Sequence, residues 1–128
     1  MSRSAARPLV RIRHILEQVV RPLLGPWPVW QLAVISALAG LFEELLFRGV
    51  LQTGLTRHVG PVLAIFSASL LFGLLHSLTW GYLWLATLIG AYLGGLYCWS
   101  GNLLVTIVAH AVYDFAALVF FLRYHSEP

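Results

Sequence analysis

Glu43, Glu44 and Arg48 place three ionisable side chains inside an apolar stretch of the chain, residues 41–49. A charged side chain near the centre of a bilayer costs about 3 kcal/mol or more, so such residues normally face a charged partner or a water-filled cavity. Glu44 and Arg48 are spaced i and i+4 with the acid first, which favours an ion pair on one helix. Glu43 points about 100° away from Glu44 on a helix. Glu43 therefore lacks an evident partner on its own helix and is the candidate general base.

Two histidines and a third acid follow at helical spacings. His76 lies four residues after Phe72, and His110 lies four residues before Asp114, so each pair shares one face of a helix. If these faces point inward, the histidines converge with the acids of the first stretch. Tyr113 borders the second face and is interpreted as a packing or interfacial aromatic residue. No role is assigned to the histidines in expected loops or interface: His14, His58 and His125.

Two hydrolytic chemistries fit these residue types. In the first, Glu43 and His76 activate a water molecule that attacks a peptide carbonyl, while His110 and its neighbour stabilise the oxyanion. In the second, His76, His110 and a carboxylate bind a divalent metal ion that activates the water. The chain has no H-E-x-x-H motif, no G-x-S-x-G motif and no phosphate-cradling glycine loop. The first chemistry is therefore favoured, and no metal or other cofactor is expected.

The composition is typical of a membrane protein, because 59% of the 128 residues are hydrophobic and only 10% are charged. The basic residues that precede the apolar stretches favour attraction to anionic lipid over nucleic-acid binding, so the bilayer is an expected partner and nucleic acid is not. These residues are Arg3, Arg7, Arg11, Arg13 and Arg21. With one cysteine, Cys98, no intramolecular disulfide can form, and its apolar surroundings predict a buried thiol.

The predicted fold is an all-α integral membrane bundle of four transmembrane helices preceded by an amphipathic interfacial helix. Apolar residues recur at helical spacing over residues 9–24, with basic and polar residues opposite. This helix is expected to lie in the interface plane, or else to pack on a partner, and Pro22 could end it early. The spans are expected near residues 28–52, 62–77, 82–99 and 103–122, with a loop around residues 57–61.

The chain accordingly divides into three parts: residues 1–27 (a tail and the amphipathic helix), 28–123 (the transmembrane core) and 124–128 (a second tail). The first seven residues lack the apolar core of a cleaved signal peptide, so they are expected to be retained. Arginine placement predicts that both termini are cytoplasmic, with Arg57 on the outer side. The membrane is expected to be a bacterial plasma membrane.

A four-residue spacing, mostly of polar or small residues, recurs in every expected span, which predicts inward-facing stripes. The stripes are Ser36, Gly40, Glu44, Arg48 and Gln52; Ala64, Ala68, Phe72 and His76; Ala86, Gly90, Gly94 and Cys98; and Asn102, Thr106, His110 and Asp114. Gly90 and Gly94 form a G-x-x-x-G pair, which allows close helix packing in lipid. At about 1.5 Å per residue, Glu43 and His110 fall at compatible depths, whereas His76 falls about 10 Å or more from them.

Three motifs in order, Glu43-Glu44-x-x-x-Arg48, Phe72-x-x-x-His76 and His110-x-x-x-Asp114, resemble the signature of the CPBP (Abi) family. This family comprises the type II CAAX prenyl endopeptidases and their bacterial relatives, which are glutamate-type intramembrane proteases. The resemblance spans residues 30–121. It implies that Glu43 and His76 activate the water, that His110 and Asp114 form the oxyanion site, and that Glu44 and Arg48 support them.

The resemblance also implies cleavage of a C-terminal segment from a membrane-associated protein or peptide, which in this family can be prenylated or lipid-anchored. Bacterial members are also linked to peptide immunity. The eukaryotic pattern has Asn where this chain has Asp114, so Asp114 is either protonated or orients His110. Family members usually carry transmembrane helices in addition to this core. A homo-oligomer or a membrane partner is therefore expected to complete the wall around the polar interior.

These observations predict an intramembrane, metal-independent endopeptidase. The alternative is a non-catalytic membrane scaffold or bacteriocin-immunity-type protein that binds a peptide in the same polar interior. A proton or ion carrier is a third hypothesis, which the lack of an evident inverted repeat disfavours.

Overall fold

The computed structural model describes residues 6–124, and every regular element within them is a helix. In chain order these are α1 (Ala6–Ile15), η1 (Leu16–Val20), α2 (Arg21–Leu24), α3 (Val29–Glu44), η2 (Leu45–Gln52), α4 (Thr53–Leu75), α5 (Trp80–Ser100), α6 (Leu103–Val119) and η3 (Phe120–Tyr124), where η denotes a π-helix. The all-α prediction is confirmed for this part of the chain. Residues 1–5 and 125–128, which belong to the predicted tails and include His125, lie outside it.

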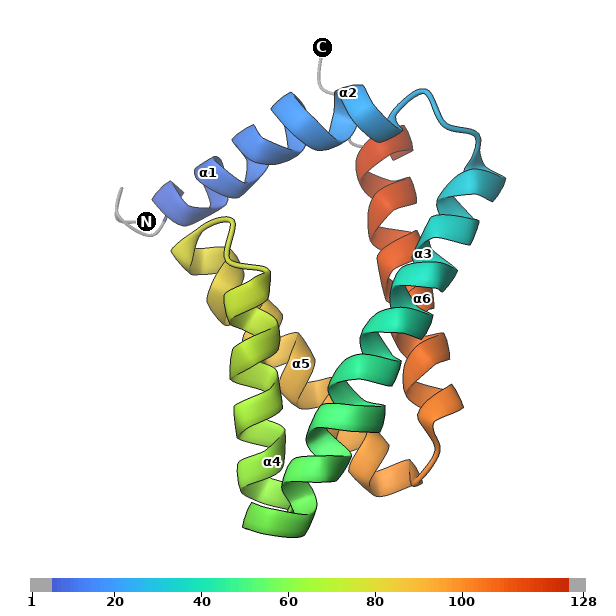
Figure 1. Cartoon of the computed structure of the whole chain (residues 1–128). Coiled ribbons are helices and arrows are strands. Elements are labelled where there is room, and N and C mark those ends of the chain that lie inside the picture. Colours follow the sequence, from blue (N-terminus) through green and yellow to red (C-terminus); the bar gives the residue numbers. More distant parts are fainter. Residues whose placement is uncertain (1–5, 125–128) are drawn as a thin grey trace.

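The long helices form two pairs that meet at one end of the molecule and splay apart at the other (Figure 1). α3 packs along α6, and α4 packs along α5. The helix formed by α1, η1 and α2, residues 6–24, is called the N-terminal helix below, and it bridges the open end of the two pairs (Figure 1). The N-terminal helix therefore lies across both helix pairs at the end where they are farthest apart.

Three helical stretches of the described chain are long and apolar enough to cross a membrane: Val29–Leu75, Trp80–Ser100 and Leu103–Tyr124. The chain is therefore an integral membrane protein. The first stretch has 47 residues and contains a break at Gly60, whose φ of 83° is left-handed. The chain reverses direction near this break (Figure 1). The expected count of four transmembrane helices stays a prediction, because the first stretch is continuous apart from Gly60.

The predicted loop around residues 57–61 is wrong. Arg57 and His58 are helical, and only Gly60 departs from helical geometry. Glycine adopts a positive φ without steric cost, and Pro61 then suits the first turn of a new helical arm because the N–H that it lacks would be unpaired there. Glu43 lies 17 residues before Gly60 and His76 lies 16 residues after it. Two arms of nearly equal length therefore bring these side chains to the same level.

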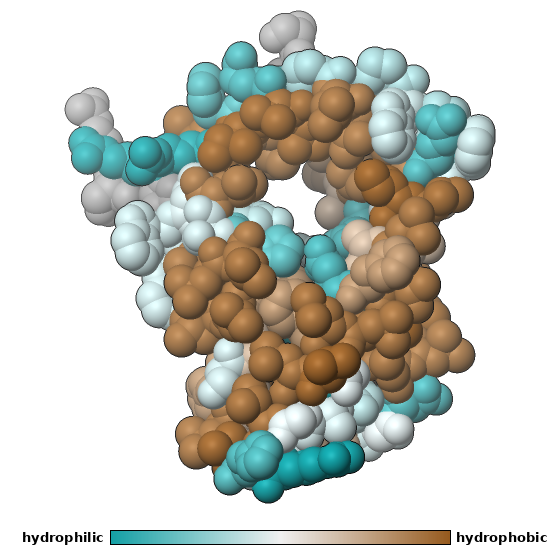
Figure 2. Space-filling model, viewed as in Figure 1, coloured by the Kyte–Doolittle hydropathy of each residue, from teal (hydrophilic) through white to brown (hydrophobic). Residues whose placement is uncertain are grey.

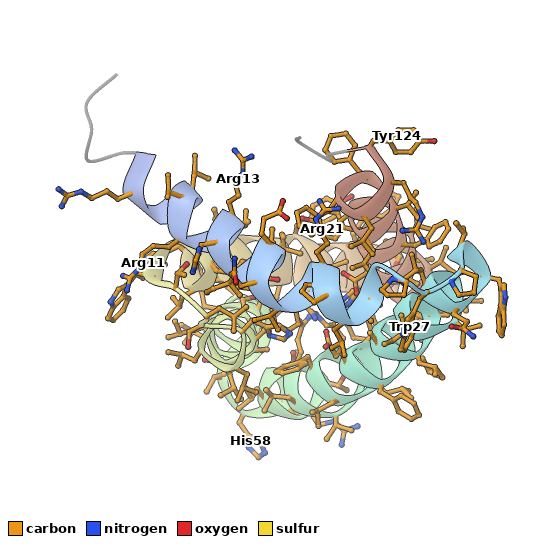
Figure 3. The ribbon with its side chains drawn as sticks, turned by 90° about the horizontal axis from the view of Figure 1, so that it is seen from above. Arg11, Arg13, Arg21, Trp27, His58 and Tyr124 are labelled. Atoms are coloured by element: carbon orange, nitrogen blue, oxygen red, sulfur yellow. The ribbon has the colours of Figure 1, made fainter. Side chains whose placement is uncertain are left out.

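The N-terminal helix continues through Pro22, contrary to the expectation that Pro22 could end it. Pro22 occupies the first turn of α2, where a missing N–H is tolerated. Arg21 donates to Glu17 at 2.7 Å and to the backbone oxygen of Phe121 at 3.0 Å. Viewed from above, the N-terminal helix crosses the bundle, and Arg21 lies beside η3 (Figure 3). Its expected position in the membrane interface stays a prediction.

The predicted inward stripes correspond to the buried faces of the helices. All five stripe residues of the first span are buried, as are Ala64, Ala68 and Phe72 in α4, Ala86, Gly90 and Gly94 in α5, and Thr106 and His110 in α6. The predictions for Cys98 and Asn102 are wrong, because both residues are exposed. Cys98 lies two residues before the end of α5 and beyond Gly94, the last buried position of that helix.

Candidate active site

Glu43 lies between two histidines from different helices. Its Oε1 is 3.5 Å from His76 Nε2, and its Oε2 is 3.2 Å from His110 Nε2. The Glu43 side chain is 31% exposed, so other protein atoms do not fully cover the carboxylate. The prediction that His76 lies at a different depth from Glu43 is therefore wrong. The two helical arms on either side of Gly60 are nearly equal in length, so they bring both side chains to the same level. The three residues converge, as expected if the helix faces that carry them point inward.

His76 is oriented by its own helix. The α4 helix ends at Leu75, and His76 Nδ1 donates to the Phe72 backbone oxygen at 2.7 Å. Because a carbonyl oxygen can only accept, Nδ1 carries a proton and Nε2 is turned toward Glu43. The His76 ring also stacks on Phe72, with ring centroids 4.3 Å apart. The four-residue spacing of this motif thus fixes which imidazole nitrogen meets the acid.

Glu44 has a different environment from its neighbour Glu43. Its side chain is fully buried, and Oε1 accepts from Arg48 Nη1 at 2.9 Å and from His110 Nδ1 at 2.7 Å. The ion pair of Glu44 and Arg48 is as the i, i+4 spacing predicts. The bond to His110 is not predicted by the spacing, because it joins residues on two different helices. Glu44 therefore orients the second histidine as well as pairing with the arginine.

Arg48, which lies in η2, binds α5. Its Nη2 donates to the Gly90 backbone oxygen, and its guanidinium carbon lies 5.3 Å from the centroid of the Phe72 ring. One turn further on, Gln52 Nε2 donates to the Gly94 backbone oxygen at 3.1 Å. A side chain at Gly90 would lie 3.4 Å from Arg48 Nη2. The G-x-x-x-G pair thus leaves room for two polar side chains and supplies the carbonyls that bind them.

The π-helix η2 begins directly after Glu44 and contains Arg48 and Gln52. Such segments are frequent at functional sites because they change the direction of side chains along a helix. Thr53 Oγ donates to the Arg48 backbone oxygen at 2.7 Å, which satisfies a carbonyl at this irregular turn. The four-residue spacing in the sequence does not distinguish this π-helix from an α-helix.

Asp114 completes the cluster. Its Oδ2 lies 3.2 Å from His110 Nε2, the same nitrogen that Glu43 approaches, and its side chain is 30% exposed. His110 itself is 5% exposed in its side chain and has a carboxylate at both ring nitrogens. This arrangement favours a doubly protonated imidazolium that can donate from Nε2. His14 and His58 are exposed, and neither belongs to the cluster.

No group of three or more His, Cys, Asp or Glu side chains in residues 6–124 has a geometry that could hold a metal ion. The carboxylate of Glu43 instead contacts both imidazoles directly.

The fold and the cluster define a class of protein: an integral membrane protein made of helices, with acids and histidines gathered between them. A protein-family model described as type II CAAX prenyl endopeptidase Rce1-like matches residues 25–116, which is most of the chain. The chain belongs to this family, and the resemblance to CPBP proteins is confirmed.

One similar protein is the uncharacterized protein YpbD of Bacillus subtilis (strain 168), which is 40% identical over 83 residues. The match covers 62% of this chain and 40% of the relative, so the chain spans less than half of that protein's length. No solved structure matches the chain significantly.

Proposed function

We propose that this protein is an intramembrane, metal-independent endopeptidase that hydrolyses a peptide bond of a membrane-associated protein. The observation that carries the proposal is the position of the partly exposed Glu43 carboxylate, which lies 3.5 Å from His76 and 3.2 Å from His110. A general base must be within hydrogen-bond reach of the water that it activates and of the groups that position it. Among the acids of the cluster, Glu43 combines partial exposure with both histidine contacts.

The reaction proceeds in two steps. Glu43, assisted by His76, takes a proton from water, and the resulting hydroxide adds to the carbonyl carbon of the scissile bond. The oxyanion accepts a hydrogen bond from His110 Nε2–H, with Asp114 beside it. The C–N bond then breaks as Glu43 returns the proton to the leaving nitrogen. The OH of water thus ends in the new carboxyl group, and its other hydrogen ends on the new amine.

Glu44 and Arg48 act as supporting residues in this proposal. Glu44 accepts a hydrogen bond from His110 Nδ1–H. The other ring nitrogen, Nε2, is then the one that binds the oxyanion. Arg48 neutralises Glu44 in a buried site and ties it to α5 through the Gly90 carbonyl. Asp114 supports the positive charge on His110, which is the orienting role considered from the sequence.

The name of the matched family suggests a lipid-anchored or prenylated substrate that is cut near its C-terminus. A second copy of the chain or another membrane protein would complete the wall around the polar interior. We also propose that both ends of the described chain face the cytoplasm of a bacterial cell, with the turn at Gly60 outside. Reporter fusions at Arg57 and at Pro128 test this orientation, and a C-terminus on the outer side would contradict it.

The proposal is tested with Glu43→Ala in the purified full chain, reconstituted in nanodiscs with lipid-anchored reporter peptides. A protease loses turnover by about 10²-fold or more while it keeps its fold, because general-base catalysis contributes about 10²–10⁴-fold. The non-catalytic scaffold hypothesis predicts peptide binding without turnover in the unmodified protein. Circular dichroism and size-exclusion chromatography monitor the fold, and Glu17→Gln on the N-terminal helix is the control.

A further inference from the structure

A cavity of about 460 Å³ lies beneath the N-terminal helix. Ile12, Ile15 and Leu16 of that helix form one wall, and residues of α3, α5 and α6 form the others, including Leu85, Tyr113 and Asp114. Figure 2 looks into this opening beneath the arch of the N-terminal helix, whose hydrophobic surface borders it. The lining is mostly apolar, and Asp114 connects it to the candidate active site.

A second cavity, of about 350 Å³, lies between α5 and α6. Its lining is almost entirely apolar, with Leu88, Tyr92 and Ala109 among its residues, and His110 reaches it from α6. Tyr113 lines both cavities. The two cavities thus approach the His110–Asp114 pair along different faces of α6, and Tyr113 belongs to both linings.

The first cavity contains a buried polar atom that needs a partner. Ser36 is 2% exposed, it lines the cavity, and its hydroxyl has no hydrogen-bond partner within residues 6–124. Buried hydroxyls are nearly always hydrogen-bonded, so this one points to a polar group of an occupant. A peptide offers an amide or carbonyl at every residue, whereas a hydrocarbon chain offers none. The cavity is therefore better suited to a peptide than to the lipid chain of an anchor.

The roof of the first cavity is fixed to the bundle near its C-terminal end. Arg123 donates to the backbone oxygens of Gly25 and Trp27, directly after the N-terminal helix. Leu32 is fully buried and packs with Phe121 and Leu122 at the same junction. Because the roof is held in place by both polar and apolar contacts, the cavity is a built feature of the fold.

We infer that the two cavities are subsites for apolar peptide segments on opposite sides of the scissile bond, that Tyr113 separates them, and that Ser36 hydrogen-bonds the peptide backbone in the larger one. This inference rests on the proposed endopeptidase function, since the scissile carbonyl would lie at the Glu43–His110 pair between the cavities. Tyr113 is then a specificity-determining residue, although from the sequence it is interpreted only as a packing or interfacial aromatic.

The first test compares substrate preferences of Tyr113→Ala with those of the unmodified protein. Lipid-anchored reporter peptides carry Ala, Leu or Phe on either side of the scissile bond, and kcat/KM is measured for each in nanodiscs. Pocket contacts change such ratios by about 10-fold or more, so Tyr113→Ala is expected to shift the preference toward larger side chains by that factor. Tyr124→Ala, whose side chain is highly exposed and lines neither cavity, is the control. Unchanged preferences in Tyr113→Ala overturn the inference.

The second test addresses Ser36. Loss of one hydrogen bond to the peptide raises KM about two- to tenfold in Ser36→Ala with kcat little changed. Ser69→Ala is the matched control, because Ser69 is equally buried and unpartnered but does not line the cavity. An equal change of KM in Ser36→Ala and Ser69→Ala overturns the inference. A KM that depends on the length of the lipid anchor and not on Ser36 also overturns it, because the cavity then holds a lipid chain.

The third test does not depend on turnover. The same peptides, with a photoreactive benzoylphenylalanine before or after the scissile bond, are cross-linked to the Glu43→Gln protein. The two positions are expected to label different cavities, one at Leu16 or Leu85 and the other at Leu88 or Ala109. Labelling of one cavity by both positions, or of neither, overturns the inference. In contrast, absence of cleavage by the unmodified protein rejects the endopeptidase proposal while the cross-links still report the subsites.

Discussion

His110 donates Nδ1–H to the buried carboxylate of Glu44 across 2.7 Å, and this bond determines how the histidine meets the rest of the cluster. With Nδ1 engaged, the remaining nitrogen, Nε2, faces Glu43 and Asp114. Two acids that are adjacent in the sequence therefore contact opposite sides of one imidazole ring. This division of roles leads to separate predictions for stability and for activity.

Glu44→Gln is expected to lower the free energy of unfolding by about 3–5 kcal/mol, because it leaves the Arg48 charge buried without its counter-charge. Glu17→Gln is the matched control, since Glu17 also pairs with an arginine four residues later, and its partly exposed pair contributes about 1 kcal/mol or less. Unfolding in mixed detergent micelles measures both. The double variant Glu44→Gln/Arg48→Met is expected to recover part of the loss. Equal losses for Glu44→Gln and Glu17→Gln would contradict the role of Glu44 as the buried counter-charge of Arg48.

Asp114→Asn is expected to keep activity within about tenfold of the unmodified protein, because an amide can hydrogen-bond His110 and can also donate to the oxyanion. Asp114→Ala removes both functions and is expected to lower kcat by about 10²-fold or more. Steady-state cleavage of reporter peptides distinguishes the two variants. Comparable activity of Asp114→Ala and the unmodified protein would remove Asp114 from the proposed mechanism.

Gly73→Ala is expected to destabilise the fold by about 1–3 kcal/mol through overpacking between α4 and α5. A Cβ at Gly73 would lie 2.7 Å from the Leu83 backbone oxygen and would also collide with Thr87. Gly95→Ala provides the control, because nothing lies within 4 Å of the added atom there. Gly95→Ala is expected to be neutral or to stabilise the helix by up to about 1 kcal/mol. Gly73→Ala is therefore expected to have the lower free energy of unfolding of the two variants, and the opposite order would contradict the prediction.

Chelation is expected to leave activity unchanged if Glu43 and His76 alone activate the water. The protein is dialysed against EDTA or 1,10-phenanthroline, its metal content is measured by mass spectrometry, and cleavage is assayed before and after. Lost activity that returns with a divalent cation would instead support the alternative in which His76, His110 and a carboxylate hold a metal ion.

The sequence alone determined the helical class, the inward stripes and the identity of the clustered residues. This was possible because apolar length, four-residue spacing and the cost of intramembrane charge are local properties of the chain. The pairing of Glu44 with Arg48 was predictable for the same reason, since both lie on one helix.

Tertiary structure decided everything that depends on how the helices meet. The left-handed Gly60 makes two arms of nearly equal length and so brings His76 to Glu43, where helix counting with a loop placed it too far away. The bond between His110 and Glu44, the Gly90 carbonyl that receives Arg48, and the two cavities that share Tyr113 all join residues far apart in the chain. Spacing along one helix carries no information about these contacts, because they depend on the angle and depth at which separate helices pack.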